Sequence, residues 1–176
     1  MESKLLSLAL KQGTDKCGPE HNYIPFYEST LPALPKKILE IGCFKGQSLR
    51  MWREYFPDAE LHTLDLFIEH EPPTDIAGLI AHKGHQADYY LLEELRRKNF
   101  DLIIDDGSHN SRDQMMSFFG LFTTGMHYYI EDIHCAEEEF YRQGLPFNLT
   151  PLPMLNPLSI DSLGYVDCQS PIMLIK

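Results

Sequence analysis

The stretch of sequence that decides the fold is Lys37-Ile38-Leu39-Glu40-Ile41-Gly42-Cys43-Phe44-Lys45-Gly46. A short apolar run predicts a buried strand over 37–41, and Gly42 and Gly46 bound the turn that follows it. A helix is expected over 48–55, ended by the Pro57 turn. Glycines let the backbone approach a ligand closely, and a helix start offers free N–H groups, although a simple tight turn is the alternative.

The same alternation of strand and helix repeats along the chain. Further strands are expected over 61–66, 79–83, 100–104 and 126–130, helices over 89–98 and 112–122, and a C-terminal antiparallel hairpin over 163–168 and 172–175. This order predicts an α/β fold: a Rossmann-like, doubly wound, mostly parallel seven-stranded sheet. We expect one domain, 1–176, with an N-terminal cap or lid segment over 1–35, which includes a helix at 2–11, and a Pro-rich loop over 144–160.

Composition excludes several classes of protein. The net charge of -11 over 176 residues argues against nucleic acid as a partner, because phosphate binding is driven by Lys and Arg. We expect no membrane span, since no apolar run approaches the ~20 residues required. The start, Met1-Glu2-Ser3-Lys4, lacks the features of a signal peptide, and the four cysteines show no CxxC spacing. A cytoplasmic protein with free thiols and no zinc site is expected.

The glycine turn favours a ribose-bearing cofactor other than NAD. Glu40 stands where the dinucleotide fingerprint needs its first glycine. Asp65 ends the strand 61–66 about twenty residues further on, where doubly wound folds place an acid on a ribose hydroxyl. Alone, Asp65 is better interpreted as a helix cap or a solvated strand end. Together with Gly42 and Gly46 it favours the ribose interpretation.

Two acidic clusters follow two of the expected strands: Asp105-Asp106-Gly107-Ser108-His109 and Glu131-Asp132-Ile133-His134. The carboxyl ends of parallel strands meet at one edge of the sheet, so these carboxylates should converge. Converging carboxylates repel unless a cation neutralises them, and oxygen ligands suit Mg²⁺, Ca²⁺ or Mn²⁺. The alternatives are that Asp105 or Asp106 caps the next helix and that the second cluster is a solvated loop.

The combination Glu40-x-Gly42-x-x-x-Gly46 with Asp65 resembles the class I S-adenosylmethionine-dependent methyltransferases. More narrowly, the chain resembles the metal-dependent sugar O-methyltransferases of macrolide biosynthesis and the cephalosporin-biosynthesis methyltransferase-like proteins. This resemblance is carried by Gly13-Thr14-Asp15-Lys16, His21, Tyr23 and the two acidic clusters.

The resemblance implies a role for each of several positions. The metal ligands are expected at Asp106, Glu131 and Asp132, and the general base at His109. Cofactor-binding positions are expected at Lys16, Glu40, Gly42, Gly46, Asp65, Gln86, Asp88 and Asp105. His134 is expected to be exposed or a neighbour of the ligands, and Tyr23 and Tyr27 to be packing residues.

The implied function is an S-adenosylmethionine-dependent, Mg²⁺-dependent (or Mn²⁺-dependent) O-methyltransferase. Its acceptor would be a hydroxylated small molecule, a sugar or a glycosylated metabolite, and a homo-oligomer is left open. Two other classes stay open: a metal-dependent hydrolase on a Rossmann-like sheet, and a non-catalytic binding module with a methyltransferase fold. A hydrolase would not need the stretch 40–46 with Asp65.

Overall fold

The computed structural model describes residues 3–18, 21–132, 162–164 and 172–175. Its helices are α1 (Lys4–Gln12), α2 (Ile24–Thr30), α3 (Gln47–Tyr55), α4 (Tyr89–Arg96) and α5 (Ser111–Leu121). Its strands are β1 (Lys37–Ile41), β2 (Glu60–Asp65), β3 (Ile80–Lys83), β4 (Leu102–Asp105), β5 (His127–Ile130), β6 (Ser162–Gly164) and β7 (Ile172–Ile175).

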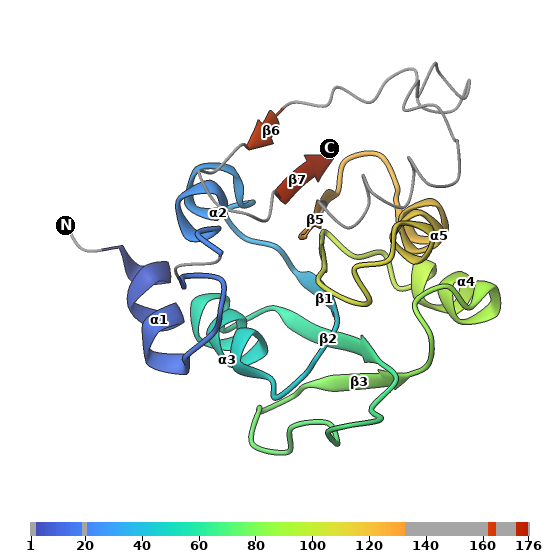
Figure 1. Ribbon diagram of the computed structural model, residues 1–176, viewed down its shortest axis with the longest axis horizontal. Coiled ribbons are helices and arrows are strands. Elements are labelled where there is room, and N and C mark those ends of the chain that lie inside the picture. The colour runs from blue at the N-terminus through green and yellow to red at the C-terminus, as the bar shows by residue number, and fades with distance from the viewer. Residues whose placement is uncertain (1–2, 19–20, 133–161, 165–171, 176) are drawn as a thin grey trace.

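The strands form one seven-stranded sheet in the order β3-β2-β1-β4-β5-β7-β6 (Figure 1). The strands from β3 to β5 pair in parallel, whereas β7 runs antiparallel to both β5 and β6. The strand order reverses between β1 and β4, and ligands of doubly wound folds bind beyond the carboxyl ends of the strands at such a point. The predicted doubly wound, mostly parallel sheet with an antiparallel C-terminal pair is confirmed.

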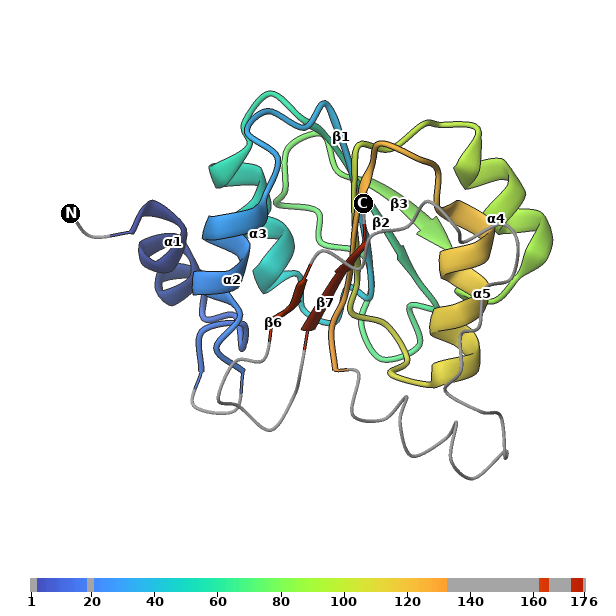
Figure 2. The same ribbon diagram turned by 90° about the horizontal axis from the view of Figure 1, so that it is seen from above.

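Helices cover both faces of the sheet. Viewed along the sheet in Figure 2, α1, α2 and α3 lie on one side and α4 and α5 on the other. Two apolar cores result, one containing Trp52 of α3 and the other containing Leu95 of α4. In β1, Ile38 belongs to the first core and Leu39 to the second, because successive side chains of a strand point to opposite faces. Burial on both sides explains the nearly unbroken apolar run in this strand.

The N-terminal segment differs from the prediction in one element. Helix α1 lies close to the predicted 2–11, with Ser3 accepting a hydrogen bond from the Leu6 amide and Gly13 ending it at φ 67°. No helix was predicted over 24–30, where α2 is found. Pro25 stands in the first turn of α2, a position that suits proline because the amide there needs no helical partner.

The other helices and strands begin and end within a few residues of their predicted positions. Strand β4 ends at Asp105, so this aspartate belongs to the strand itself. Strand β6 covers 162–164, whereas the predicted strand residues 165–168 and the predicted Pro-rich loop 144–160 lie outside the described residues. Among the helices that the structure describes, none combines the length and apolarity needed to cross a bilayer.

Candidate active site

The turn after β1 depends on its two glycines. Gly42 has φ 92°, and a Cβ atom there would lie 2.0 Å from the backbone oxygen of Asp106. Only glycine therefore lets this turn pack against the loop that follows β4. Gly46 has φ 74° and is the N-cap of α3. The predicted positions thus have backbone reasons to be glycine, and they join the turn to the acidic loop.

Asp65 holds the same turn from the end of β2. Its Oδ2 accepts a hydrogen bond of 2.7 Å from the Cys43 amide, and its Oδ1 accepts one of 2.9 Å from the Phe67 amide. The carboxylate is therefore oriented by the backbone on both sides.

A cavity of about 550 Å³ opens beyond the ends of these strands, which is large enough for a nucleoside-sized ligand. A second cavity of about 190 Å³ shares Gly42, Asp65, Leu66 and Gly107 with the first. The first is lined by Gly13, Thr14, Asp15, Gly42, Cys43, Phe44, Gln47, Ser48, Asp65, Leu66, Ile68, Glu69, His70, Asp106, Gly107 and His109.

The structure places three further predicted cofactor positions, Gln86, Asp88 and Asp105, in different environments. Gln86 lines it; its Oε1 accepts from the Ser108 amide at 2.7 Å and its Nε2 donates to Asp105 at 3.1 Å. Asp105 is fully buried behind Gln86, and burial raises its pKa to about 6. Asp88 caps α4 by accepting from the Tyr90 and Leu91 amides. Of the three, the structure brings only Gln86 to the cavity wall.

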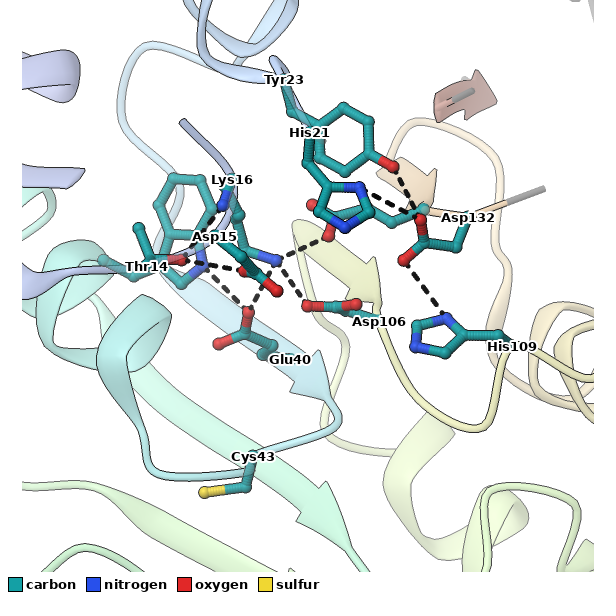
Figure 3. A network of polar contacts seen from close by, with 12 residues as sticks. Thr14, Asp15, Lys16, His21, Tyr23, Glu40, Cys43, Asp106, His109 and Asp132 are labelled. Carbon is teal, nitrogen blue, oxygen red and sulfur yellow. Dashed lines mark hydrogen bonds and ion pairs between the residues drawn. The ribbon is translucent and has the colours of Figure 1, made fainter. Parts of the chain in front are cut away.

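Asp106, His109 and Asp132 come together at the edge of the large cavity (Figure 3). Each offers one ligand atom, and these atoms lie within 4.8 Å of one another. The Nδ1 atom of His109 is buried with no hydrogen-bond partner and lies 3.4 Å from Asp132 Oδ2. The two carboxylates suit a hard divalent cation, and the imidazole stands beside them.

The backbone is unusual at two of these residues. His109 and Asp132 both have φ 55°, in the left-handed region that non-glycine residues rarely adopt. Such conformations cost of order 1–3 kcal/mol each and persist only where the surrounding structure imposes them.

The side chain that caps α5 is Asn110, which accepts from the Arg112 and Asp113 amides. The alternative in which Asp105 or Asp106 caps this helix is therefore wrong.

Lys16 lies beneath the cluster, with its side chain 1% exposed. Its Nζ is 2.6 Å from Asp106 Oδ2, 2.6 Å from Glu131 Oε2 and 3.6 Å from Glu40 Oε1. Burial opposes the charged form, but the three carboxylates outweigh it and raise the pKa of Lys16 above its ordinary value. The ammonium thus faces the acidic cluster, whereas its neighbours Thr14 and Asp15 line the cavity.

Glu40 and Glu131, both predicted site residues, are buried around Lys16. Burial raises the pKa of Glu40 to about 7, although Lys16 opposes the shift, and the Trp52 indole donates to its Oε1 at 3.4 Å. Glu131 accepts from Lys16 with one oxygen and from the Tyr27 hydroxyl with the other. Within the described residues, Glu131 is not part of the group formed by Asp106, His109 and Asp132.

Sequence reasoning missed the role of the segment between α1 and α2. Tyr23 and Tyr27 were expected to be packing residues only, yet the Tyr23 hydroxyl donates to Asp132 and that of Tyr27 to Glu131. The His21 ring also lies 3.4 Å from Asp132 Oδ1. The polar and aromatic residues that follow Lys16 in the sequence could have indicated that this segment contacts the site. His134 lies outside the described residues.

Comparison with known proteins first identifies the class. The methyltransferase MycE from the mycinamycin biosynthetic pathway, solved in complex with Mg and SAH, matches at 27% identity and a TM-score of 0.69, over 89% of this chain and 45% of that chain. An SAH-bound O-methyltransferase from Bacillus cereus shares the fold, with a TM-score of 0.55 at 15% identity. The fold is that of the class I methyltransferases. No family model matches the chain.

Curated relatives narrow the class further. A tetracenomycin-C rhamnosyl 3'-O-methyltransferase from Streptomyces olivaceus is 34% identical over 73% of this chain and 36% of its own length. The L-olivosyl-oleandolide 3-O-methyltransferase of Streptomyces antibioticus is 30% identical over 90% of this chain and 45% of its own length. The predicted relationship to the macrolide-type sugar O-methyltransferases is confirmed, and the chain belongs to the family of macrolide and tetracenomycin sugar O-methyltransferases. The chain spans less than half the length of these relatives.

Proposed function

We propose that the chain is the catalytic part of an S-adenosylmethionine-dependent, divalent-metal-dependent O-methyltransferase acting on a hydroxyl of a glycosylated small molecule. The observation that carries this proposal is the meeting of Asp106, His109 and Asp132 at the wall of the cavity beneath the glycine turn. Asp132 is not itself a lining residue of that cavity, but its carboxylate belongs to the group. A cation site and a nucleoside-sized cavity thus share one edge.

The cofactor would lie in the two joined cavities. Gly42 and Gly46 shape the turn, and Asp65 at the end of β2 is placed to meet a ribose. Gln86 lines the part expected to hold the adenine. S-adenosylmethionine supplies the methyl group as a sulfonium, whose C–S bond breaks as the new O–C bond forms.

Asp106 and Asp132 would hold the cation, which supplies Lewis acidity toward the acceptor hydroxyl. Glu131 stays a predicted ligand, although in the present arrangement both its oxygens are engaged by Lys16 and Tyr27. His109 would accept the hydroxyl proton through its other ring nitrogen, because its Nδ1 is buried and lies 3.4 Å from Asp132 Oδ2 while the side chain as a whole is 37% exposed. Holding the acceptor in line with the methyl group supplies much of the remaining acceleration.

Two relatives methylate sugars attached to tetracenomycin and oleandolide, which supports a glycosylated small molecule as the acceptor. The net charge of -11 supports a small-molecule acceptor over nucleic acid.

The test combines binding with turnover. Calorimetry should show S-adenosylhomocysteine and Mn²⁺ binding to the wild-type protein, and methyl transfer should be assayed on tetracenomycin-type and macrolide glycosides. His109→Ala should keep both affinities and lose turnover by about 10²–10⁴-fold, the usual contribution of a positioned base. His82→Ala on the edge strand β3 serves as the control for losing an imidazole.

Three results would contradict parts of this proposal. A folded wild-type protein without affinity for S-adenosylhomocysteine would reject the methyltransferase assignment. Loss of Mn²⁺ affinity in His109→Ala would make His109 a ligand. Normal turnover in that variant would make it structural.

A further inference from the structure

Tyr23 and Tyr27, which frame the start of α2, reach two neighbouring acids of the site. Their side chains are almost completely buried, at 1% and 0% exposure. The Tyr23 hydroxyl donates to Asp132 Oδ1 at 3.0 Å, as Figure 3 shows, and the Tyr27 hydroxyl donates to Glu131 Oε1. Each of the two adjacent carboxylates therefore has its own tyrosine from the N-terminal segment.

Packing alone would not require these hydroxyls. Phenylalanine fills nearly the same volume, and a hydroxyl buried without a partner costs free energy. The hydroxyls are matched instead to carboxylates, where a hydrogen bond to a charged acceptor is stronger than a neutral one.

The two carboxylate oxygens of Asp132 have different neighbours. Oδ1 accepts from Tyr23, whereas Oδ2 lies 3.4 Å from His109 Nδ1, on the side of the candidate cation group. The hydrogen bond from Tyr23, together with the His21 ring 3.4 Å from Oδ1, restrains rotation of the carboxylate, so that its other oxygen stays turned toward the candidate cation group.

We propose that Tyr23 is a positioning residue that orients Asp132 for the divalent cation, and that Tyr27 supports this arrangement by fixing Glu131, the residue next to Asp132. This inference rests on the proposed function, because it assumes a cation at this site. Partners that orient metal ligands in this way commonly contribute about 10–100-fold to metal affinity.

The experiment measures Mn²⁺ affinity of Tyr23→Phe and Tyr27→Phe by electron paramagnetic resonance, together with thermal stability. The matched control is Tyr129→Phe, because the Tyr129 ring is equally buried, contacts Tyr27 and donates its hydroxyl to Thr30 at 3.0 Å. We expect Mn²⁺ to bind Tyr23→Phe about 10–100-fold more weakly than wild type, and Tyr129→Phe to bind it normally. Tyr27→Phe gives a second, separate measurement if one variant fails to fold.

The outcomes separate the two proposals. If wild type binds Mn²⁺ and both Tyr23→Phe and Tyr27→Phe bind it as Tyr129→Phe does, the positioning role is wrong and the proposed function stands. If all three variants lose affinity in proportion to their loss of thermal stability, the hydroxyls are merely structural and the inference is overturned. If wild type itself binds no Mn²⁺, both proposals fail.

Discussion

At the scale of single residues, Lys16 carries a buried charge that three carboxylates share. Removing one partner of a buried ion pair leaves the other charges uncompensated, which typically costs about 3–5 kcal/mol. We therefore expect Lys16→Met to lower the free energy of unfolding by about this amount, measured by urea denaturation.

Lys11→Met is the matched control, because Lys11 forms an exposed ion pair with Glu54 at 2.7 Å. Exposed pairs contribute little to stability, so this variant should unfold close to wild type. The double variant Lys16→Met/Glu131→Gln should recover part of the loss, since it removes a carboxylate together with the ammonium. Equal costs for Lys16→Met and Lys11→Met would contradict this account.

A second residue-scale feature is the pair of histidines on β2 and β3. His62 Nδ1 lies 2.8 Å from His82 Nε2 with the rings stacked, and the Glu60 carboxylate contacts the other nitrogen of His62. The pKa of His82 is lowered to about 4, mainly by burial and further by the nearby His62 and Lys98. Lys37 also faces His62, and Glu94 acts on His82 in the opposite direction.

This pair predicts the direction of a pH effect. As pH falls below 6.5, the ordinary pKa of histidine, His82 becomes protonated in the unfolded chain but stays neutral in the folded protein. The contribution of His82 to the free energy of unfolding should therefore fall between about pH 6.5 and pH 4. The raised pKa values of Glu40 and Asp105 act in the opposite direction over this range, so the effect of His82 is isolated by comparing variants. His82→Gln should reduce this slope in denaturation curves measured across the range. An unchanged slope would show that His82 is not responsible.

At the scale of elements, the turn after β1 and the loop after β4 pack backbone against backbone at Gly42. Gly42→Ala would force these loops apart, so we expect it to weaken S-adenosylhomocysteine binding by at least about tenfold. It should also destabilise the fold by more than the ~1–2 kcal/mol that a left-handed backbone conformation alone costs a non-glycine residue. Gly13→Ala is the control, because Gly13 also has positive φ, at 67°, but a methyl group on its Cα would meet nothing within 4 Å. Equal effects in denaturation and binding assays would mean that strain, not the contact, matters at Gly42.

At the scale of the whole molecule, the sheet could be predicted because each strand is marked by a short local pattern in the sequence. Apolar runs bounded by turn residues marked the strands from β1 to β5, and their alternation with helices indicated the parallel order. Helix α2 is only seven residues long, so the helical spacing of Tyr23, Phe26 and Tyr27 covers a single turn, which is too short a pattern to predict a helix. The cation group was predictable in part, since Asp106 and Asp132 follow strands that parallel pairing brings together.

The roles of neighbouring acids were harder to predict. Asp105 and Asp106 are adjacent, but successive side chains near a strand point to opposite faces. Asp105 thus lies under α5, where Ser117 donates to it, while Asp106 meets Lys16 and the cavity. The sequence also could not show that Tyr23 and Lys16 reach these acids, because such contacts depend on the complete fold.

The contacts of Lys16, Tyr23 and Tyr27 also bear on the order in which the molecule folds. They join positions that are 90, 115, 109 and 104 residues apart in the chain. Closing such long loops costs chain entropy that local contacts do not offset, so these contacts belong among the last to form. We therefore expect the sheet to bring the acids together first and the N-terminal segment to dock on them afterwards. On this view, full affinity for a cation is acquired late, as a sign that folding is complete.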